Sequence, residues 1–232
     1  MRTAIYTVLV SVLFMSSAWA ATATGKSKAN EGKQSKQVSV PVPRQGDPVI
    51  GREKADSERC IECHGLDGQG AGHPNGPEGK FAKLAAQSPA YVLKQIQDFR
   101  SGARKHDQMA IMARSVEDED VRDIAAYFAS LPAMKGDGGG EVHEVGKKLF
   151  LQGDPARGVV ACASCHGDKG QGISSTPLVP RLAGQEWRYL EKQLLEWRSG
   201  ERRNSPDGVM NAVVKPLTDA EVASLINYLS GL

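Results

Sequence analysis

Two short segments contain all four cysteines of the chain, and each begins with the pattern Cys-x-x-Cys-His. They read CIECHG at residues 60–65 and CASCHG at residues 162–167. Two thiols one helical turn apart can add to the two vinyl groups of one porphyrin, and the histidine that follows then lies under its iron. Each segment is therefore a candidate attachment site for a covalent haem c. The candidate residues are Cys60, Cys63, His64, Cys162, Cys165 and His166.

Three other uses of paired cysteines fit less well. A disulfide is plausible in an exported protein, but it gives no reason for a histidine after both pairs. A thioredoxin-type redox pair requires a βαβ context, and no alternating strand pattern is present. Cys-x-x-Cys pairs that hold zinc lie about 15 to 20 residues apart, whereas these pairs are about a hundred residues apart.

The second ligand of each iron is expected at equivalent positions in the two halves of the chain. Met109 and Met210 meet this condition, since each lies seven residues before an aligned apolar residue, Val116 or Leu217. A methionine opposite a histidine raises the reduction potential, which suits electron transfer. Met210 has no rival in its half. Met112 remains an alternative to Met109, although it aligns with Val213.

The three remaining histidines are weaker candidates for iron ligands. His73 and His106 have no histidine at the aligned positions of the second half, and His143 lies next to the glycine-rich joint. We therefore interpret all three as surface residues.

The segments that must position these residues form an internal repeat. Residues 109–131 align without a gap with residues 210–232, and residues 84–102 match residues 182–200. Self-similarity of this kind indicates one structural unit built twice. We therefore expect two domains of the same fold.

The unit is helical by its hydrophobic periodicity. Apolar residues recur at steps of three and four, which gathers them on one face of a helix. Thr218 and Glu221 form a capping-box pattern at the start of the last helix. The predicted helices are 90–101, 118–131, 187–199 and 219–229, with short first helices from 51 and 146. We therefore expect the all-α fold class, with two tandem domains, each a small helical fold around one covalently bound haem.

The first 20 residues have the pattern of a secretory signal peptide. A positive Arg2 precedes an apolar run that ends near Met15, and Ala18-Trp19-Ala20 is a small-x-small cleavage site. The run is shorter than the roughly 20 residues that a membrane-spanning helix needs. We expect export to the periplasm, cleavage near Ala20, and no transmembrane segment in the mature chain.

Composition divides the rest of the chain. Residues 21–48 are polar and basic and lack apolar periodicity, so we interpret them as a disordered, solvated tether. Peripheral contact of this tether with a membrane surface remains open. Residues 135–142 form a glycine-rich linker between an N-terminal domain at 49–134 and a C-terminal domain at 143–232. The formal net charge of +2 argues against a nucleic-acid partner.

The combined pattern resembles the dihaem cytochrome c4 family over about residues 50–232. Each half has Cys-x-x-Cys-His, then LAxQ…Y…KQ…RSG, then a methionine and a terminal helix. The resemblance implies two facing cytochrome c domains with two covalently bound haem c groups. It also implies periplasmic transport of single electrons toward a terminal oxidase or other acceptor from a respiratory donor such as quinol–cytochrome c reductase.

One segment departs from the family pattern. The family has a Pro-Lys/Arg-Leu segment whose proline carbonyl accepts the ring N–H of the axial histidine. Residues 180–182 read Pro-Arg-Leu, but residues 82–84 read Ala-Lys-Leu. Because the first domain lacks the rigidity of proline there, we expect a looser haem loop.

The resemblance leaves the functional class open at one point. The favoured function is a diffusible electron carrier, and the alternative is the haem subunit of a dehydrogenase complex, such as a sulfide-oxidising flavocytochrome. A dihaem peroxidase would need an open iron position, which the paired methionines oppose. No Ser-His-Asp set or pair of pocket carboxylates suggests catalysis, so we expect an electron-transfer protein and not an enzyme.

Overall fold

The computed structural model describes residues 44–71, 81–136 and 143–232. These residues belong to one compact unit, Pro43–Leu232. The predicted signal peptide, residues 21–43 of the predicted tether, residues 137–142 of the linker, and His73 lie outside the described residues.

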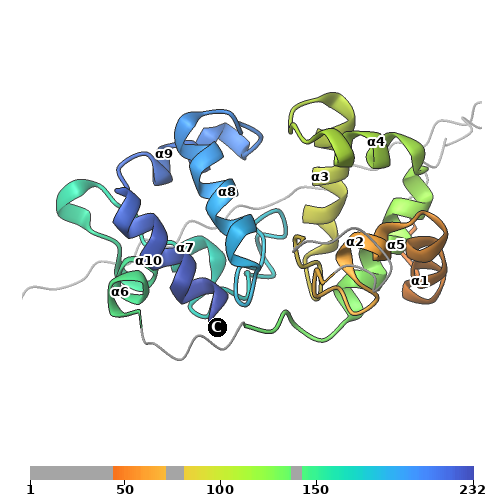
Figure 1. Ribbon diagram of the computed structural model, residues 1–232, viewed down its shortest axis with the longest axis horizontal. Helices are drawn as coiled ribbons and strands as arrows, with labels where there is room; N and C mark the ends of the chain where they lie inside the picture. The colour runs from red at the N-terminus through yellow and green to blue at the C-terminus, as the bar shows by residue number, and fades with distance from the viewer. Residues whose placement is uncertain (1–43, 72–80, 137–142) are drawn as a thin grey trace, which may run out of the picture. The chain divides into compact units, whose positions relative to one another are not determined.

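The described part of the chain is helical, which confirms the predicted fold class (Figure 1). Its only β pairing is an isolated bridge between Asp154 and Val159. The first domain contains α1 (Pro48–Ser57), α2 (Cys60–His64), α3 (Pro89–Ser101), α4 (Asp107–Ser115) and α5 (Asp118–Ser130). The second contains α6 (Glu144–Gln152), η1 (Pro155–Arg157), α7 (Ala163–His166), α8 (Trp187–Ser199), η2 (Pro206–Gly208), α9 (Val209–Val214) and α10 (Asp219–Ser230).

The predicted helix ends agree closely with the structure. The helices α3 and α8 end at Gly102 and Gly200, both with φ near 79°, a left-handed conformation that glycine adopts without strain. At the start of α10 the Thr218 side chain accepts from the backbone N–H of Glu221, and the Glu221 side chain accepts from the N–H of Thr218. This confirms the predicted capping box. The helices α4 and α9 were not predicted.

The first and last helices of each domain approach very closely. In the first domain α1 packs against α5, and in the second α6 packs against α10. A Cβ atom at Gly51 would lie 1.8 Å from the carbonyl oxygen of Asp123, and one at Gly146 would lie 2.0 Å from that of Ser224. The crossing therefore depends on glycine at both positions.

Each domain has its own hydrophobic core, built from the apolar faces of these helices. The core of the second domain includes Phe150, Trp197 and Leu225. The core of the first, over the described residues, is formed by Ala55, Ile124, Tyr127 and Phe128. Both cores lie against the helix that carries the Cys-x-x-Cys-His pattern, since Cys60 and Cys162 pack at their margins.

Polar contacts hold residues just outside both predicted ends of the first domain, while the boundaries themselves stay predictions. The end of the predicted tether belongs to the first domain, because Arg44 pairs with Asp123 at 2.9 Å and Asp47 caps α1. The start of the predicted linker is also held, since the backbone N–H of Lys135 donates to the side-chain oxygen of Gln69 at 2.9 Å. Single polar contacts, and not apolar periodicity, hold these residues.

No helix in the described ranges combines the length and apolar character needed to cross a bilayer.

Candidate haem sites

The two Cys-x-x-Cys-His segments form short helices that end in the same way. The helix α2 holds the first segment, and α7 begins directly after Cys162. Both end at a glycine with positive φ, 78° at Gly65 and 81° at Gly167. This turn stops the helix directly after the histidine, so the chain leaves the site and returns beneath it.

Both histidines are oriented by a hydrogen bond to a backbone carbonyl. The Nδ1 atom of His64 lies 2.8 Å from the oxygen of Ala82, and the Nδ1 atom of His166 lies 2.9 Å from the oxygen of Pro180. A carbonyl only accepts, so Nδ1 must carry the proton, and Nε2 keeps its lone pair free for a metal. Burial lowers the pKa of both imidazoles, which favours this neutral form.

The cysteines differ from those of a redox pair. All four thiols are free, with no disulfide between them. Burial raises the pKa of Cys60 to about 12 and that of Cys162 to about 11. A thioredoxin-type pair instead has a lowered thiol pKa, so the buried, protonated thiols argue against a redox pair. The described residues also hold no cluster of three or more acidic, histidine or cysteine side chains suited to a metal ion.

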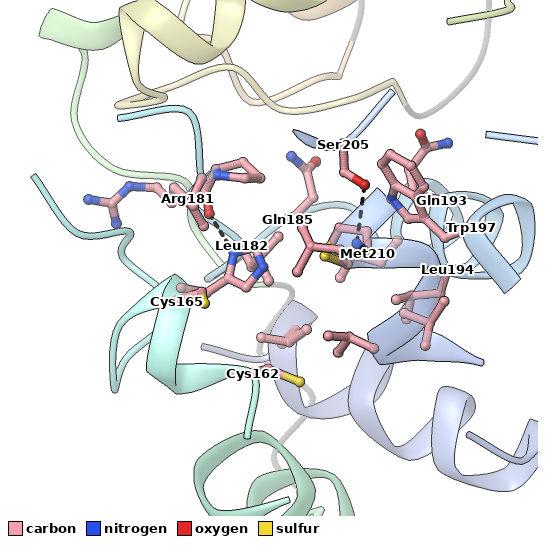
Figure 2. Close-up of a pocket in the computed structure, with 18 of the residues that line it drawn as sticks. Cys162, Cys165, Arg181, Leu182, Gln185, Gln193, Leu194, Trp197, Ser205 and Met210 are labelled. Atoms are coloured by element: carbon pink, nitrogen blue, oxygen red, sulfur yellow. Dashed lines mark hydrogen bonds between the residues drawn. The ribbon is translucent and has the colours of Figure 1, made fainter. Parts of the chain in front are cut away.

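In the second domain the predicted residues line one cavity. Cys165 and His166 reach it from α7, Cys162 reaches it from directly before α7, and Met210 reaches it from α9. The close-up shows the Met210 side chain across the cavity from the two cysteines (Figure 2). The remaining wall is largely apolar and includes Leu182, Leu194, Trp197, Leu225 and Leu229. A porphyrin fits this donor set, since a free imidazole nitrogen and a thioether face a mainly apolar space between them.

In the first domain the structure places both candidate methionines on α4. Met109 and Met112 are three residues apart and partly buried, on the same face as the buried Ala113. Val213, the residue aligned with Met112, lines the cavity of the second domain, as Met210 does. The choice of Met109 over Met112 stays a prediction. Nearby, His106 is exposed and accepts from the N–H of Met109 at 3.3 Å, so it caps α4.

A buried polar cluster joins the two domains, and the sequence did not reveal it. Arg104 and Arg202, at equivalent positions of the repeat, are 8% and 6% exposed. Arg104 donates to Gln193 and to the hydroxyl of Tyr189 in the second domain. Arg202 of the second domain donates in the same way to Gln95 and to the hydroxyl of Tyr91 in the first domain. The signal was present, because the same polar residues recur at the same places in both repeats.

Comparison with known proteins shows the same duplication. The cytochrome c family model matches residues 49–132 and again residues 144–232. Cytochrome c4 of Thiocapsa roseopersicina is 37% identical over 191 residues, covering 82% of this chain and 95% of that protein. The thiosulfate dehydrogenase electron acceptor of Stutzerimonas stutzeri is 35% identical over 176 residues, covering 75% of this chain and 78% of that protein.

A solved structure has a similar fold. The crystal structure of reduced recombinant cytochrome c4 from Pseudomonas stutzeri gives a TM-score of 0.71 at 35% sequence identity. The match covers 81% of this chain and 99% of that one. The similarity therefore extends over both repeats.

Proposed function

We propose that this chain, which belongs to the dihaem cytochrome c4 family, carries single electrons between protein partners in the periplasm. Its two cytochrome c domains bind two haem c groups covalently, so it is a dihaem electron-transfer cytochrome. The proposed donor is a respiratory complex such as quinol–cytochrome c reductase, and the proposed acceptor is a terminal oxidase.

Each residue of the motif has a separate task in this proposal. The thiols of Cys60 and Cys63 attach the first haem, and those of Cys162 and Cys165 attach the second. The bound haem supplies the one-electron chemistry. The protein supplies a mainly apolar surrounding and fixes the ligands, and these are the properties through which it sets the reduction potential.

The axial ligands decide between a carrier and an enzyme. His64 and His166 would offer Nε2 to an iron, because Nδ1 of each ring is bonded to a backbone carbonyl. Met109 and Met210 are the proposed ligands on the opposite sides. If a histidine and a methionine held each iron, no coordination position would be left for a substrate, and this would favour electron transfer over peroxidase chemistry. The observation that carries this step is that Met210 and His166 line the same cavity.

The optical spectrum of the exported protein tests this proposal. It should contain two haems per chain and the weak ferric-iron-to-methionine absorption band at the intensity of two ligated irons. The protein should also show no peroxide turnover. A band of half that intensity together with peroxide turnover would mean that one iron is open and would contradict the carrier function.

A second candidate function is supported by the names of some relatives of this chain. The protein from Stutzerimonas stutzeri is named as the electron acceptor of thiosulfate dehydrogenase. In this alternative the chain accepts electrons from a dehydrogenase of sulfur compounds, as a separate protein or as a subunit. Affinity purification from the native host followed by stopped-flow reduction separates the two functions. A dehydrogenase that co-purifies with the chain and reduces its haems when supplied with a sulfur substrate would favour the alternative. Reduction of the haems by the quinol-oxidising complex alone would favour the carrier function.

The periplasmic location is a proposal from the first 20 residues. The sequence predicts cleavage after Ala20, so the mature chain should begin at Ala21. Osmotic-shock fractionation followed by intact-mass measurement tests this. A haem-containing chain of full length in the membrane fraction would overturn it.

A further inference from the structure

The haem loops of the two domains form reciprocal hydrogen bonds with each other. The loop at residues 82–87 and the loop at residues 180–185 occupy equivalent places in the two repeats. Gln185 of the second domain bonds the backbone of Lys83 in the first, and Gln87 of the first domain bonds the backbone of Arg181 in the second. Both glutamines are buried, each 3% exposed.

The orientation of each glutamine amide is fixed by its partners. The Oε1 atom of Gln185 accepts from the N–H of Lys83 at 2.7 Å, while its Nε2 atom donates to the carbonyl of Lys83 at 3.0 Å. A flipped amide would place two donors together and two acceptors together. The Lys83 side chain adds a further bond, from Nζ to the carbonyl oxygen of Gly184 at 2.7 Å.

The hydrogen bonds of Gln185 connect to His64 through a shared peptide unit. The N–H of Lys83 and the carbonyl of Ala82 belong to one peptide unit, and this carbonyl is the acceptor of His64 Nδ1. The hydrogen bonds therefore run from Gln185 through one peptide group to His64. An acceptor on the N–H of an amide polarises it and makes its carbonyl a stronger acceptor.

The second domain contains the mirror arrangement. Gln87 Oε1 accepts from the N–H of Arg181 at 2.9 Å, and Gln87 Nε2 donates to the Arg181 carbonyl at 3.1 Å. That N–H shares its peptide unit with the carbonyl of Pro180, the acceptor of His166 Nδ1. Arg181 Nε also donates to the carbonyl of Ala86 at 3.2 Å, matching the contact of Lys83.

We propose that Gln185 and Gln87 are positioning residues, each of which tunes the axial histidine of the opposite domain. A stronger bond from Nδ1–H to its carbonyl makes the imidazole a more basic ligand. A more basic ligand favours ferric iron and lowers the reduction potential. Each domain thus sets part of the potential of its neighbour's haem, so the two potentials depend on an intact interface.

Replacing Gln185 by methionine tests the proposal. The Gln185→Met variant keeps a side chain of similar length and removes both hydrogen bonds to Lys83. We expect the potential of the first-domain haem to rise more than that of the second. In the ferrous protein the Nδ1–H proton signal of His64 should move upfield and exchange faster with solvent. The Gln87→Met variant should give the opposite pattern, with the change at His166.

Gln193→Met is the matched control. Gln193 is also a buried glutamine of the interface, but it bonds the two arginines and not a haem loop. We expect it to leave both histidine N–H signals unchanged. The proposal would be overturned if Gln185→Met and Gln193→Met changed the His64 N–H signal equally. It would also be overturned if Gln185→Met changed the potential of the second-domain haem more than that of the first.

Gln185→Glu keeps the proposal testable if the methionine variant fails to mature. In its protonated form, glutamate keeps one oxygen that accepts from the Lys83 N–H and gains an O–H that can donate to the Lys83 carbonyl, so at a pH where it is protonated the first-domain potential should not rise. A rise of the first-domain potential in this variant would contradict the proposed influence of Gln185 on His64. The inference rests on the proposed function, which the haem content and methionine band of the unmodified protein test separately.

Discussion

Arg104 and Arg202 both donate to the side-chain oxygen of Gln193, at 2.6 and 2.5 Å, so two buried cations lie close together between the domains. The hydrogen-bond partners described for these guanidinium groups are neutral amides and hydroxyls, including Gln95 and Tyr189. Arg202 also lines the cavity of the second domain. Its charge therefore acts on that cavity through a medium with little water.

Replacing Arg202 with methionine should lower the potential of the second-domain haem. A nearby positive charge favours ferrous over ferric iron, and burial weakens solvent screening of that charge. Arg203→Met is the matched control, because the adjacent Arg203 is exposed. A redox titration that resolves the two haems should show a clearly larger shift for Arg202. Equal shifts in the two variants would mean that the burial of Arg202 has no electrostatic effect on the haem.

Replacing each methionine of α4 by leucine identifies the ligand of the first iron. Leucine fills a similar volume but offers no sulfur. We expect Met109→Leu to remove half of the ferric-iron-to-methionine absorption and to lower the potential of one haem. Met112→Leu should leave both unchanged, and Met210→Leu is the reference for loss of one ligand. The reverse result for Met109 and Met112 would assign the ligand to Met112.

The long helices were predictable because each buries a broad apolar face. The spacing of Val121, Ile124 and Phe128 predicts α5, and the structure places the ends of this helix at Asp118 and Ser130. The helices α4 and α9 are shorter, nine and six residues, and each has a single buried residue. A hydrophobic repeat cannot be recognised in segments this short with one buried residue each, although they contain the candidate methionines.

The contacts between the domains were not predictable from one sequence. Gln87 and Gln185 are polar residues in a loop, a context that usually indicates exposure, yet both are buried. Their burial depends on the close approach of two separately folded repeats. By contrast, the proposed roles of the two histidines follow from local pattern, because each lies directly after its cysteine pair.

Acid should remove part of the stability of the first domain through Asp123. Arg44 donates to Asp123 Oδ2 at 2.9 Å and the backbone N–H of Asp47 donates to Oδ1 at 2.7 Å. The hydrogen bond from Arg44 holds the pKa of this carboxyl below its ordinary value. A depressed folded-state pKa stabilises the fold at pH above the ordinary aspartate value of about 3.9, and this contribution is lost as pH falls through the folded-state pKa.

The Arg44→Gln variant tests this dependence. Urea unfolding, followed by far-ultraviolet circular dichroism, should show lower stability than the unmodified protein at pH 7. The difference should narrow as the pH falls below 4, since the carboxyl becomes protonated in both proteins. Arg52→Gln, on the exposed side of α1, should show no such convergence. A stability difference for Arg44→Gln that stays constant across this range would rule out Asp123 as its source.

Adding one methyl group at Gly146 should destabilise the second domain. The new Cβ would lie 2.0 Å from the carbonyl oxygen of Ser224 and 3.0 Å from the Cβ of Tyr228, so α6 must move away from α10. Overpacking usually costs about 1–3 kcal/mol, and a clash with backbone, which cannot rotate away, should reach at least the upper end of that range. The matched control is Lys147→Ala, at the adjacent exposed position of the same helix. Chemical unfolding should show the loss for Gly146→Ala and almost none for Lys147→Ala. Equal stability of the two variants would mean that α6 and α10 pack less closely than the structure shows.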